Sequence, residues 1–180
     1  MPIARKRTRR GMSARFPPTA VLKRIRLFAM DVDGVLTDAG MYYSESGEEL
    51  KKFNTRDGMG IKLLQRAGLI TALITMEETK LVSRRAEKLA IPEVHQGTRD
   101  KLAVLREMVA RHGLTLQDVA FIGDDVNDLE ALNAAGFSAA PADALPAVRS
   151  AVDYVCRQKG GDGAVREVAD LILAAHAKQT

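Results

Sequence analysis

The sequence has one cysteine and three histidines among its 180 residues, and this scarcity excludes several kinds of site. Because Cys156 is alone, the chain cannot form an internal disulfide, and we predict a small packed side chain there. Zinc sites need clustered Cys and His ligands, whereas His95, His112 and His176 are scattered along the chain. No apolar run approaches the roughly 20 residues that span a bilayer, so we expect no membrane helix.

Acidic residues are absent from positions 1–26, which hold nine of the 27 Lys and Arg residues. The remaining 18 basic residues face all 23 acids, so the rest of the chain carries a net charge of −5. The high isoelectric point of about 9.3 therefore belongs to the N-terminal segment. Such a basic arm could bind nucleic acid or a membrane surface. We favour a disordered, solvated extension over residues 1–24, and we expect neither partner.

An export signal is also missing from this segment. Arg9 and Arg10 are typical of a twin-arginine signal, which additionally needs an apolar stretch. No such stretch follows before Pro17 and Pro18. We therefore predict a cytoplasmic protein.

Beyond Pro18, short apolar runs alternate with amphipathic segments over a length that suits one domain. The apolar runs predict parallel strands at residues 26–30, 69–74, 93–95, 119–122, 137–140 and 154–156. The amphipathic segments predict helices at 58–67, 78–89, 101–112, 126–135, 144–150 and 163–177. Gly68, Gly113 and Gly136 stand where helix C-caps belong. This order predicts one α/β domain over residues 25–180, a Rossmann-like parallel sheet with helices on both faces.

Residues 40–53 interrupt the alternation between the first strand and the first helix. Their two β-forming stretches are separated by Ser, Glu and Gly, which predicts a β-hairpin that projects over the carboxyl end of the first strand. An isolated two-stranded ribbon is only marginally stable in water. We therefore expect another subunit to pack against it, although a simple edge ribbon is the alternative.

Two acidic clusters come directly after two of the predicted strands. Asp31 and Asp33 share one side of the chain because side chains alternate along a strand, and Gly34 then turns the chain. Two carboxylates so close would repel each other unless a cation lies between them or one of them reacts. The second cluster reads Gly123-Asp124-Asp125-Val126-Asn127-Asp128. A helix N-terminus would explain one or two of its acids, but two such clusters indicate a magnesium-dependent phosphoryl-transfer site.

Five motifs follow one another in a recognisable order. They are Asp31-Val32-Asp33-Gly34-Val35-Leu36-Thr37-Asp38, Asn54-Thr55-Arg56-Asp57-Gly58, His95-Gln96-Gly97, Gly123-Asp124-Asp125 with Asp128, and Gly160-Gly161-Asp162-Gly163-Ala164-Val165-Arg166-Glu167. In this order they resemble the haloacid dehalogenase superfamily, over roughly residues 25–173. The subgroup they resemble has no cap domain and acts on 3-deoxy-D-manno-octulosonate 8-phosphate or on nonulosonate (sialic-acid-type) 9-phosphates. The resemblance implies a phosphomonoesterase for the terminal phosphate of a 2-keto-3-deoxy sugar acid, as in lipopolysaccharide or sialic acid biosynthesis.

The resemblance also implies catalytic roles. Asp31 is the implied nucleophile, which attacks phosphorus and forms an aspartyl-phosphate. Asp33 would protonate the leaving alcohol and then accept a proton from the attacking water. Thr75 would bind the phosphate through its hydroxyl and backbone N–H, and Lys101 would hold the phosphate and neutralise Asp31. Without the resemblance, Thr75 could be a helix cap and Lys101 a solvated side chain.

A Mg²⁺ site is implied at the carboxylates of Asp31 and Asp124 and the backbone carbonyl of Asp33. Asp125 and Asp128 would lie behind these ligands and orient one of them or Lys101. The candidates for substrate binding are Asp33, Asn54, Thr55, Arg56, Asp57, Gly58, Glu77, Arg85, Lys88 and Lys101. The basic members of this set suit a carboxylate or sugar hydroxyls, but each could instead be a surface charge.

Three positions depart from the octulosonate branch, which has Thr-Gly-Arg in its second motif and Gly-Gly-Arg-Gly near its end. Here the sequence reads Thr75-Met76-Glu77, and Asp162 replaces the later arginine. An acid after the threonine motif and a lysine that matches Lys88 are typical of the nonulosonate branch. The choice between the two sugar acids therefore stays open.

Relatives in this subgroup are homotetramers, in which the hairpin builds the central contact and neighbouring subunits close the active site. We predict the same assembly, with residues 160–163 able to reach a neighbour. Two other functions stay open: a regulatory or nucleic-acid-interacting protein on a phosphatase scaffold, and a phosphatase of another small sugar phosphate. A phosphotransferase usually needs a cap domain to exclude water, and no insertion here is long enough for one.

Overall fold

A parallel sheet forms the centre of the computed structural model, which describes residues 17–45 and 49–177. Its six strands lie in the order β5-β4-β1-β6-β7-β8. They are β1 (Leu27–Met30), β4 (Ile70–Ile74), β5 (Glu93–His95), β6 (Val119–Ile122), β7 (Phe137–Ala140) and β8 (Tyr154–Val155). The predicted α/β class is confirmed, and each predicted strand is present with its ends moved by at most one residue.

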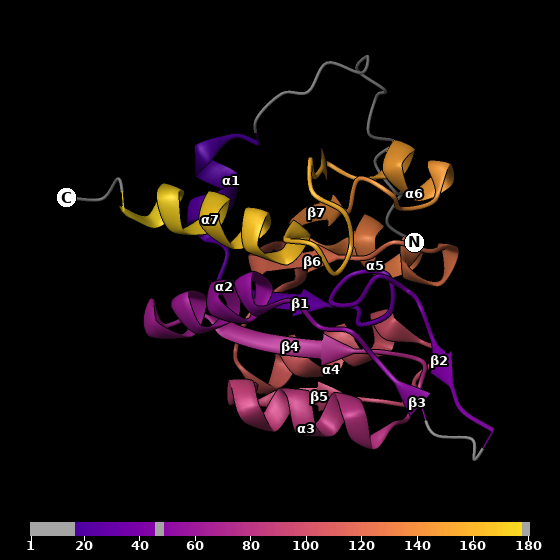
Figure 1. Cartoon of the computed structure of the whole chain (residues 1–180). Coiled ribbons are helices and arrows are strands. Elements are labelled where there is room, and N and C mark those ends of the chain that lie inside the picture. The colour runs from indigo at the N-terminus through magenta and orange to yellow at the C-terminus, as the bar shows by residue number, and fades with distance from the viewer. Residues whose placement is uncertain (1–16, 46–48, 178–180) are drawn as a thin grey trace.

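Helices cover both faces of this sheet (Figure 1). The α-helices are α1 (Thr19–Arg24), α2 (Thr55–Arg66), α3 (Lys80–Leu89), α4 (Lys101–Arg111), α5 (Leu129–Ala134), α6 (Pro146–Ala151) and α7 (Ala164–Ala177). The first three and α7 share one apolar core with the sheet, while α4, α5 and α6 share a second core on the opposite face. In the described part of the chain, no helix combines the length and apolar character needed to cross a membrane.

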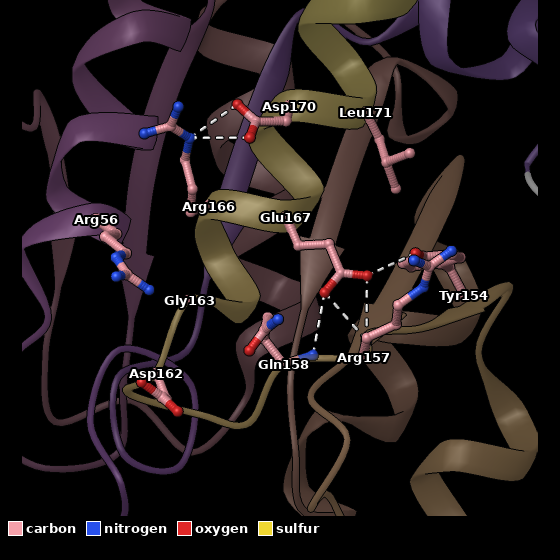
Figure 2. A pocket seen from close by; sticks show the side chains of 10 residues that line it. All are labelled: Arg56, Tyr154, Arg157, Gln158, Asp162, Gly163, Arg166, Glu167, Asp170 and Leu171. Carbon is pink, nitrogen blue, oxygen red and sulfur yellow. Dashed lines mark hydrogen bonds and ion pairs between the residues drawn. The ribbon is translucent and has the colours of Figure 1, made fainter.

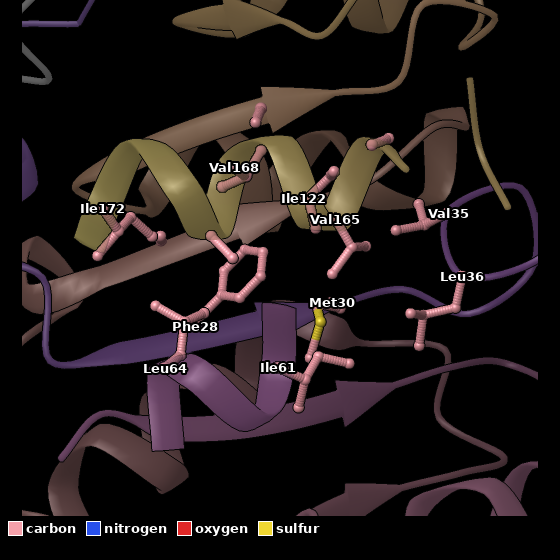
Figure 3. Packing of buried hydrophobic residues seen from close by; sticks show 14 of the residues in the cluster. Phe28, Met30, Val35, Leu36, Ile61, Leu64, Ile122, Val165, Val168 and Ile172 are labelled. Carbon is pink, nitrogen blue, oxygen red and sulfur yellow. The ribbon is translucent and has the colours of Figure 1, made fainter. Parts of the chain in front are cut away.

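The central strand β1 is buried on both faces, and its side chains alternate between the two cores. Phe28 packs with Leu64 of α2 and Val168 of α7 (Figure 3). Leu27 and Ala29 point the other way, into the core beneath α4, α5 and α6. A strand covered on both faces must be apolar throughout, which explains why the sequence reads as a continuous run there.

The chain leaves β1 and β6 toward opposite faces, since α2 lies on one face and α5 on the other. These two strands are neighbours in the sheet. In open α/β sheets such a reversal leaves a crevice at the carboxyl ends of the two strands, where ligands bind. Asp31 follows β1 directly, and Asp124 follows β6 after one glycine. The fold therefore brings the two acidic clusters to one place.

Several helix ends differ from prediction because side chains cap them locally. Helix α2 starts at Thr55 and not at residue 58, because the side chain of Asn54 accepts a hydrogen bond from the Arg56 backbone N–H at 2.8 Å. The helix predicted at 126–135 is divided into a 3₁₀ turn, η2 (Val126–Asp128), and α5. A second 3₁₀ turn, η1 (Leu116–Asp118), precedes β6.

The predicted extension over residues 1–24 is wrong in its last part. Residues 1–16 lie outside the described residues, but Thr19–Arg24 form helix α1. Leu22 is buried in the core, and its carbonyl oxygen accepts a hydrogen bond from His176 of α7 at 3.2 Å. Arg24 forms an ion pair with Asp118 at 2.9 Å. Helix α1 is therefore part of the packed domain, whose boundary lies before residue 19.

The predicted hairpin is present but short. It pairs β2 (Tyr42–Tyr43) with β3 (Glu49–Leu50) in antiparallel register. Figure 1 shows this ribbon beyond the end of the sheet to which the β4 arrow points, so it projects from the carboxyl ends of the strands as expected. Its side chains at Tyr43 and Leu50 are 67% and 63% exposed. Little in the described chain covers this ribbon.

Two of the three glycines predicted as helix C-caps have the expected left-handed backbone. Gly68 and Gly113 have φ of +84° and +64°. Gly136 does not have a positive φ. A Cβ at Gly136 would instead lie 2.2 Å from the backbone oxygen of Gln117, so this glycine permits close packing of two chain segments.

We predict different costs for two glycine substitutions. Gly136→Ala should lower the free energy of unfolding by about 3 kcal/mol, because the backbone of Gln117 cannot yield as a flexible side chain would. Gly68→Ala should cost only about 1 kcal/mol, since the space is open and only the positive φ is strained. Urea unfolding of both variants measures the difference, and equal losses would contradict the close contact at Gly136.

Candidate active site

A buried lysine lies between two buried aspartates at the carboxyl edge of the sheet. Nζ of Lys101, the first residue of α4, lies 2.9 Å from Oδ1 of Asp31 and 2.6 Å from Oδ1 of Asp128. All three residues are at most 5% exposed. The alternative of a solvated Lys101 is therefore wrong. Lys101 directly neutralises the predicted nucleophile.

Asp128 joins this ion pair to the backbone of the second acidic cluster. Its Oδ2 accepts hydrogen bonds from the backbone N–H groups of Asp124 at 2.9 Å and Asp125 at 3.3 Å. Asp128 therefore orients both Lys101 and the chain around Asp124, as predicted. The exposed carboxylate of Asp125 caps η2 by accepting from the Val126 N–H, and its predicted role toward a ligand or Lys101 stays a prediction.

Asp124 lies directly above the turn that follows β1. The side chain of Asp124 approaches Gly34 so closely that a Cβ there would lie 2.0 Å from its Oδ2. Gly34 also has a φ of +78°, so both backbone conformation and space require glycine. Gly123 has a similar role, because a Cβ there would lie 2.5 Å from Cγ of Asp128. The two glycines allow the acidic clusters to meet.

The carboxylates exceed the positive charge available to them. Burial raises the pKa of Asp31 to about 8, and the charge of Asp128 adds to this while Lys101 opposes it. Burial likewise raises the pKa of Asp124 to about 7, with Asp128 and Asp125 as further causes. Burial alone would lower the pKa of Lys101, but the charges of Asp31 and Asp128 outweigh it and raise that pKa. One lysine does not neutralise this cluster.

A divalent cation fits this arrangement. Oxygen atoms of Asp31, Asp124 and Asp128 all lie within 4.8 Å of one another. Oδ1 of Asp124 is buried and has no hydrogen-bond partner in the described part of the chain. Because both oxygens of Asp128 are already engaged, Asp31 and Asp124 are the better carboxylate ligands. An all-oxygen set of this kind suits Mg²⁺, and the contribution of the Asp33 carbonyl stays a prediction.

Asp33 faces a second lysine, which the sequence analysis did not select. Nζ of Lys51, one residue after β3, lies 2.5 Å from Oδ1 of Asp33 and 2.6 Å from Oε2 of Glu77. The hairpin thus delivers a cation to the predicted acid–base residue. The sequence did predict a hairpin over the site, but it could not show which of Lys51 and Lys52 would point inward. Lys52 instead pairs with Asp38 at 3.1 Å.

Thr75 is buried at the end of β4, but only part of its predicted role is possible. Its backbone N–H donates to the carbonyl oxygen of His95 at 2.9 Å, as part of the sheet. The N–H is therefore not available to a phosphate, and that prediction is wrong. The Thr75 hydroxyl oxygen accepts from the backbone N–H of Glu77 at 3.2 Å, which leaves its hydrogen for a ligand.

Three members of the motif Asn54 to Gly58 have structural partners within the chain, while the predicted role of this motif in substrate binding stays a prediction. Asp57 is fully buried, and its carboxylate accepts from the backbone N–H groups of Gly163 at 3.2 Å and Arg166 at 2.8 Å. Asp57, which belongs to α2, thereby caps the N-terminus of α7. Asn54 caps its own helix and donates to the Gly161 carbonyl at 3.3 Å. A Cβ at Gly58 would lie 2.7 Å from the guanidinium of Arg85, so this side chain would have to shift if another residue stood there.

The basic substrate candidates do not gather around Asp31 in this chain. Arg85 donates to the backbone oxygen of Asn54 at 2.8 Å, and its guanidinium lies 5.3 Å from the ring centre of Phe53. Lys88 is exposed in the last turn of α3, far along a helix that begins near the site. Thr55 and Arg56 are exposed in the first turn of α2. Their predicted substrate roles therefore stay predictions that need a partner outside this chain.

A surface hollow of about 490 Å³ lies apart from the acidic clusters and includes Arg56 (Figure 2). Its charged groups largely satisfy one another. Arg166 binds Asp170 at 2.8 Å, and Glu167 accepts from the hydroxyl of Tyr154 at 2.6 Å and from the backbone N–H of Arg157. The motif residue Glu167 therefore ties the loop after β8 to α7, which is a structural role.

The glycine-rich loop before α7 packs against the Asp31 motif. A Cβ at Gly160 would lie 1.9 Å from the backbone oxygen of Gly34, and the Gly161 N–H donates to the Val35 oxygen at 2.9 Å. Gly160, Gly161 and Gly163 are buried, while Asp162 is exposed. Gly160 and Gly161 therefore serve close packing within the chain, and Gly163 is required by its φ of +107°.

The fold and the acidic cluster define a class of protein. The chain belongs to the haloacid dehalogenase-like hydrolase family, whose model matches residues 69–168. It is 46% identical over 154 residues to the 3-deoxy-D-manno-octulosonate 8-phosphate phosphatase of Yersinia pestis, covering 86% of this chain and 82% of that protein. The Escherichia coli phosphatase of the same name is 42% identical over 159 residues, covering 88% of this chain and 85% of that protein.

Solved structures agree with this similarity. The Yersinia pestis phosphatase superposes with a TM-score of 0.87 at 44% identity, over 89% of this chain and 86% of that one. The Moraxella catarrhalis phosphatase, solved with magnesium, phosphate and KDO, superposes with a TM-score of 0.87 at 41% identity. The match covers 89% of this chain and 92% of that one. A hypothetical protein from Xanthomonas campestris superposes with a TM-score of 0.88 at 38% identity, over 99% of this chain and 95% of that one.

We predict that Mg²⁺ stabilises this protein more at pH 8 than at pH 6. The folded-state pKa values of Asp31 and Asp124 lie above the ordinary value of 3.8, so the folded state holds protons that the unfolded chain releases. Without metal, stability therefore falls as the pH rises from about 4 toward about 8. A bound cation favours the ionised carboxylates and offsets this loss. Thermal unfolding at both pH values, with Mg²⁺ and with EDTA, measures how much Mg²⁺ raises the unfolding temperature.

Asp124→Asn is the informative variant in this experiment. Without metal it should unfold at the same temperature or a higher one, because it removes a carboxylate whose buried oxygen has no partner among the described residues. The free energy of unfolding should rise by up to roughly 1 kcal/mol. It should also lose the response to Mg²⁺. Asp125→Asn, at the exposed neighbour, should keep that response. An undiminished Mg²⁺ response in Asp124→Asn would contradict the metal site.

Proposed function

We propose that this protein is a magnesium-dependent phosphatase that removes the terminal phosphate of a 2-keto-3-deoxy sugar acid. The observation that carries the proposal is the convergence of Asp31, Asp124 and Lys101 at the carboxyl edge of the sheet, with Asp33 beside them. Together they provide a nucleophile, its counter-ion, a cation site and an acid–base group. A regulatory protein on the same scaffold would have no need of this complete set.

Asp31 would attack the phosphorus and form an aspartyl-phosphate. Lys101, at 2.9 Å, favours the ionised and therefore nucleophilic carboxylate, against the effect of burial. Lys101 is held in place by Asp128, so its charge stays fixed as charge develops on the transferring group. When bound at Asp31 and Asp124, Mg²⁺ would supply further positive charge to the phosphoryl oxygens.

Asp33 would serve as acid and then as base. It would give a proton to the leaving alcohol oxygen when the P–O bond breaks, and later take one from the water that attacks the aspartyl-phosphate. Its Oδ2 is buried and has no hydrogen-bond partner among the described residues. This oxygen is available for the proton. Thr75 would contribute its hydroxyl hydrogen to the phosphate.

We infer 3-deoxy-D-manno-octulosonate 8-phosphate as the substrate. The support comes from the relatives of that name, which are 42% and 46% identical to this chain. Glu77, an acid where the octulosonate branch has arginine, does not weigh against this inference, because Lys51 neutralises it at 2.6 Å. Lys88 is the remaining feature of the nonulosonate branch, so a nonulosonate 9-phosphate is the compound to compare.

We further propose that the protein is a homotetramer in which the hairpin contacts neighbouring subunits. Met41, Tyr42, Tyr43 and Leu50 are exposed apolar side chains on this short ribbon. The exposed Thr55 and Arg56 would then meet a neighbour's active site. Cys156 is buried and free, which suits the predicted cytoplasmic location, and that location stays a prediction.

Asp31→Asn tests the proposed chemistry. It should reduce phosphate release from octulosonate 8-phosphate by about a thousandfold or more, because no nucleophile remains. The amide has the shape of the carboxyl and no charge, so thermal unfolding without metal should not occur at a lower temperature. Asp38→Asn, in the same motif but paired with Lys52, is the matched control and should stay active. Turnover by Asp31→Asn would refute the nucleophile.

The same assay compares substrates. The wild-type kcat/KM for octulosonate 8-phosphate should exceed the values for a nonulosonate 9-phosphate and for glucose 6-phosphate by about tenfold or more. Equal, slow rates on all three would overturn the inferred substrate and leave the chemistry of Asp31 unaffected.

Leu50→Lys tests the assembly. A charge at this exposed apolar position should dissociate the tetramer, because it would be buried without a partner in a subunit contact. Sedimentation equilibrium measures the mass relative to the 19.6 kDa chain. Val155→Lys changes an exposed apolar residue of the edge strand β8, outside both the hairpin and α2, and should keep the wild-type mass. A wild-type monomer, or a tetramer of Leu50→Lys, would count against the hairpin contact.

A further inference from the structure

Three segments that are distant in the sequence meet at the ammonium group of Lys51. Lys51 follows β3 in the hairpin, Asp33 lies in the turn after β1, and Glu77 lies just beyond β4. Both carboxylates contact Nζ, at 2.5 and 2.6 Å. The hairpin is thus bound to the catalytic edge by one cation between two anions.

This ion pair differs from an ordinary surface pair. The side chain of Lys51 is covered, whereas the side chains of Asp33 and Glu77 are 30% and 40% exposed. Burial alone would lower the pKa of Lys51, but hydrogen bonds and charges from the two carboxylates outweigh it and raise that pKa. Lys51 therefore stays protonated, and a covered ammonium with two short contacts has a defined position.

The two oxygens of Asp33 have different surroundings. Oδ1 is held by Lys51, while Oδ2 is buried and has no hydrogen-bond partner in the described residues. A carboxyl group that must exchange a proton with substrate needs one oxygen left for that purpose. It also needs a fixed rotation, since proton transfer requires hydrogen-bond geometry. The contact of Lys51 with Oδ1 fixes the rotation of the carboxyl group and leaves Oδ2 for the proton.

We propose that Lys51 is a positioning residue for Asp33, which fixes Oδ1 so that Oδ2 faces the leaving-group oxygen, and that Glu77 holds Lys51 in this place. The inference rests on the proposed function, in which Asp33 protonates the leaving alcohol. In that step the bond from Asp31 to phosphorus forms, the bond from phosphorus to the leaving oxygen breaks, and the proton of Asp33 goes to that oxygen.

A positioning role predicts a dependence on the leaving group. A sugar alcohol is a poor leaving group and needs the proton as the bond breaks, whereas p-nitrophenolate leaves readily without one. Lys51→Met should therefore lower kcat for octulosonate 8-phosphate by about tenfold or more with little change in KM. On p-nitrophenyl phosphate it should lower kcat by less than about threefold.

Four further variants complete the test. Lys52→Met removes the adjacent lysine, which contacts Asp38 and not Asp33, and should leave both rates unchanged. Lys51→Arg should recover part of the loss on the sugar phosphate, because it restores a cation with donors. Glu77→Gln should act in the same direction as Lys51→Met but more weakly, and the double variant should match Lys51→Met alone, because Glu77 acts through Lys51.

Equal losses on both substrates would overturn the inference, since they would show that Lys51 binds the phosphate or only supports the hairpin. A rise in KM alone, or no loss, would overturn it as well. Asp33→Asn is measured beside these variants and should show the same leaving-group dependence more strongly. A failure of the proposed function would appear differently, as continued turnover by Asp31→Asn.

Discussion

The contact of one buried ammonium with two buried carboxylates organises the active edge of this protein. Lys101 joins the end of β1, through Asp31, to the segment after β6, through Asp128, and it is itself the first residue of α4. Asp128 in turn holds the backbone of Asp124. Buried charges are tolerated only when they are paired, so the removal of Lys101 would leave two buried carboxylates without a counter-ion. Burial raises the pKa values of Asp31 and Asp124, and a bound divalent cation would favour their ionised forms.

Close packing of backbone makes this charge cluster possible. Gly34 lies against Asp124, Gly123 against Asp128, and Gly160 against the oxygen of Gly34, each too near for a Cβ. The loop before α7 therefore supports the turn that carries Asp31 and Asp33. The described residues include no cap domain, and the hairpin reaches over the edge of the sheet through Lys51. Its exposed apolar residues link the proposed assembly to the same ribbon, so subunit contacts and the position of Asp33 share one structural element.

The motif from Asn54 to Gly58 shows a limit of reasoning from local sequence. A carboxylate that caps a helix and a carboxylate that binds a ligand look alike in a sequence, because both accept hydrogen bonds from N–H groups. Asp57 has such partners within the chain, at the start of α7, and Gly58 allows α2 to approach Arg85. The same ambiguity affected Thr75, whose hydroxyl suits a phosphate but whose N–H belongs to the sheet. In each case the partner lies far away in the sequence, so local pattern could not reveal it.

The sequence by itself determined the alternation of strands and helices and the edge of the sheet at which Asp31, Asp33 and Asp124 lie. These depend on side-chain periodicity and on the rule that parallel strands end at one edge. Lys101 was selected only through the resemblance to a known family. Only the tertiary structure decided that Lys51 and not Lys52 meets Asp33, that Glu77 shares this lysine, and that Arg85 donates to the backbone of Asn54. The reason is physical: the direction of a hairpin side chain depends on how the ribbon twists and packs over the sheet, and that follows from contacts between distant segments.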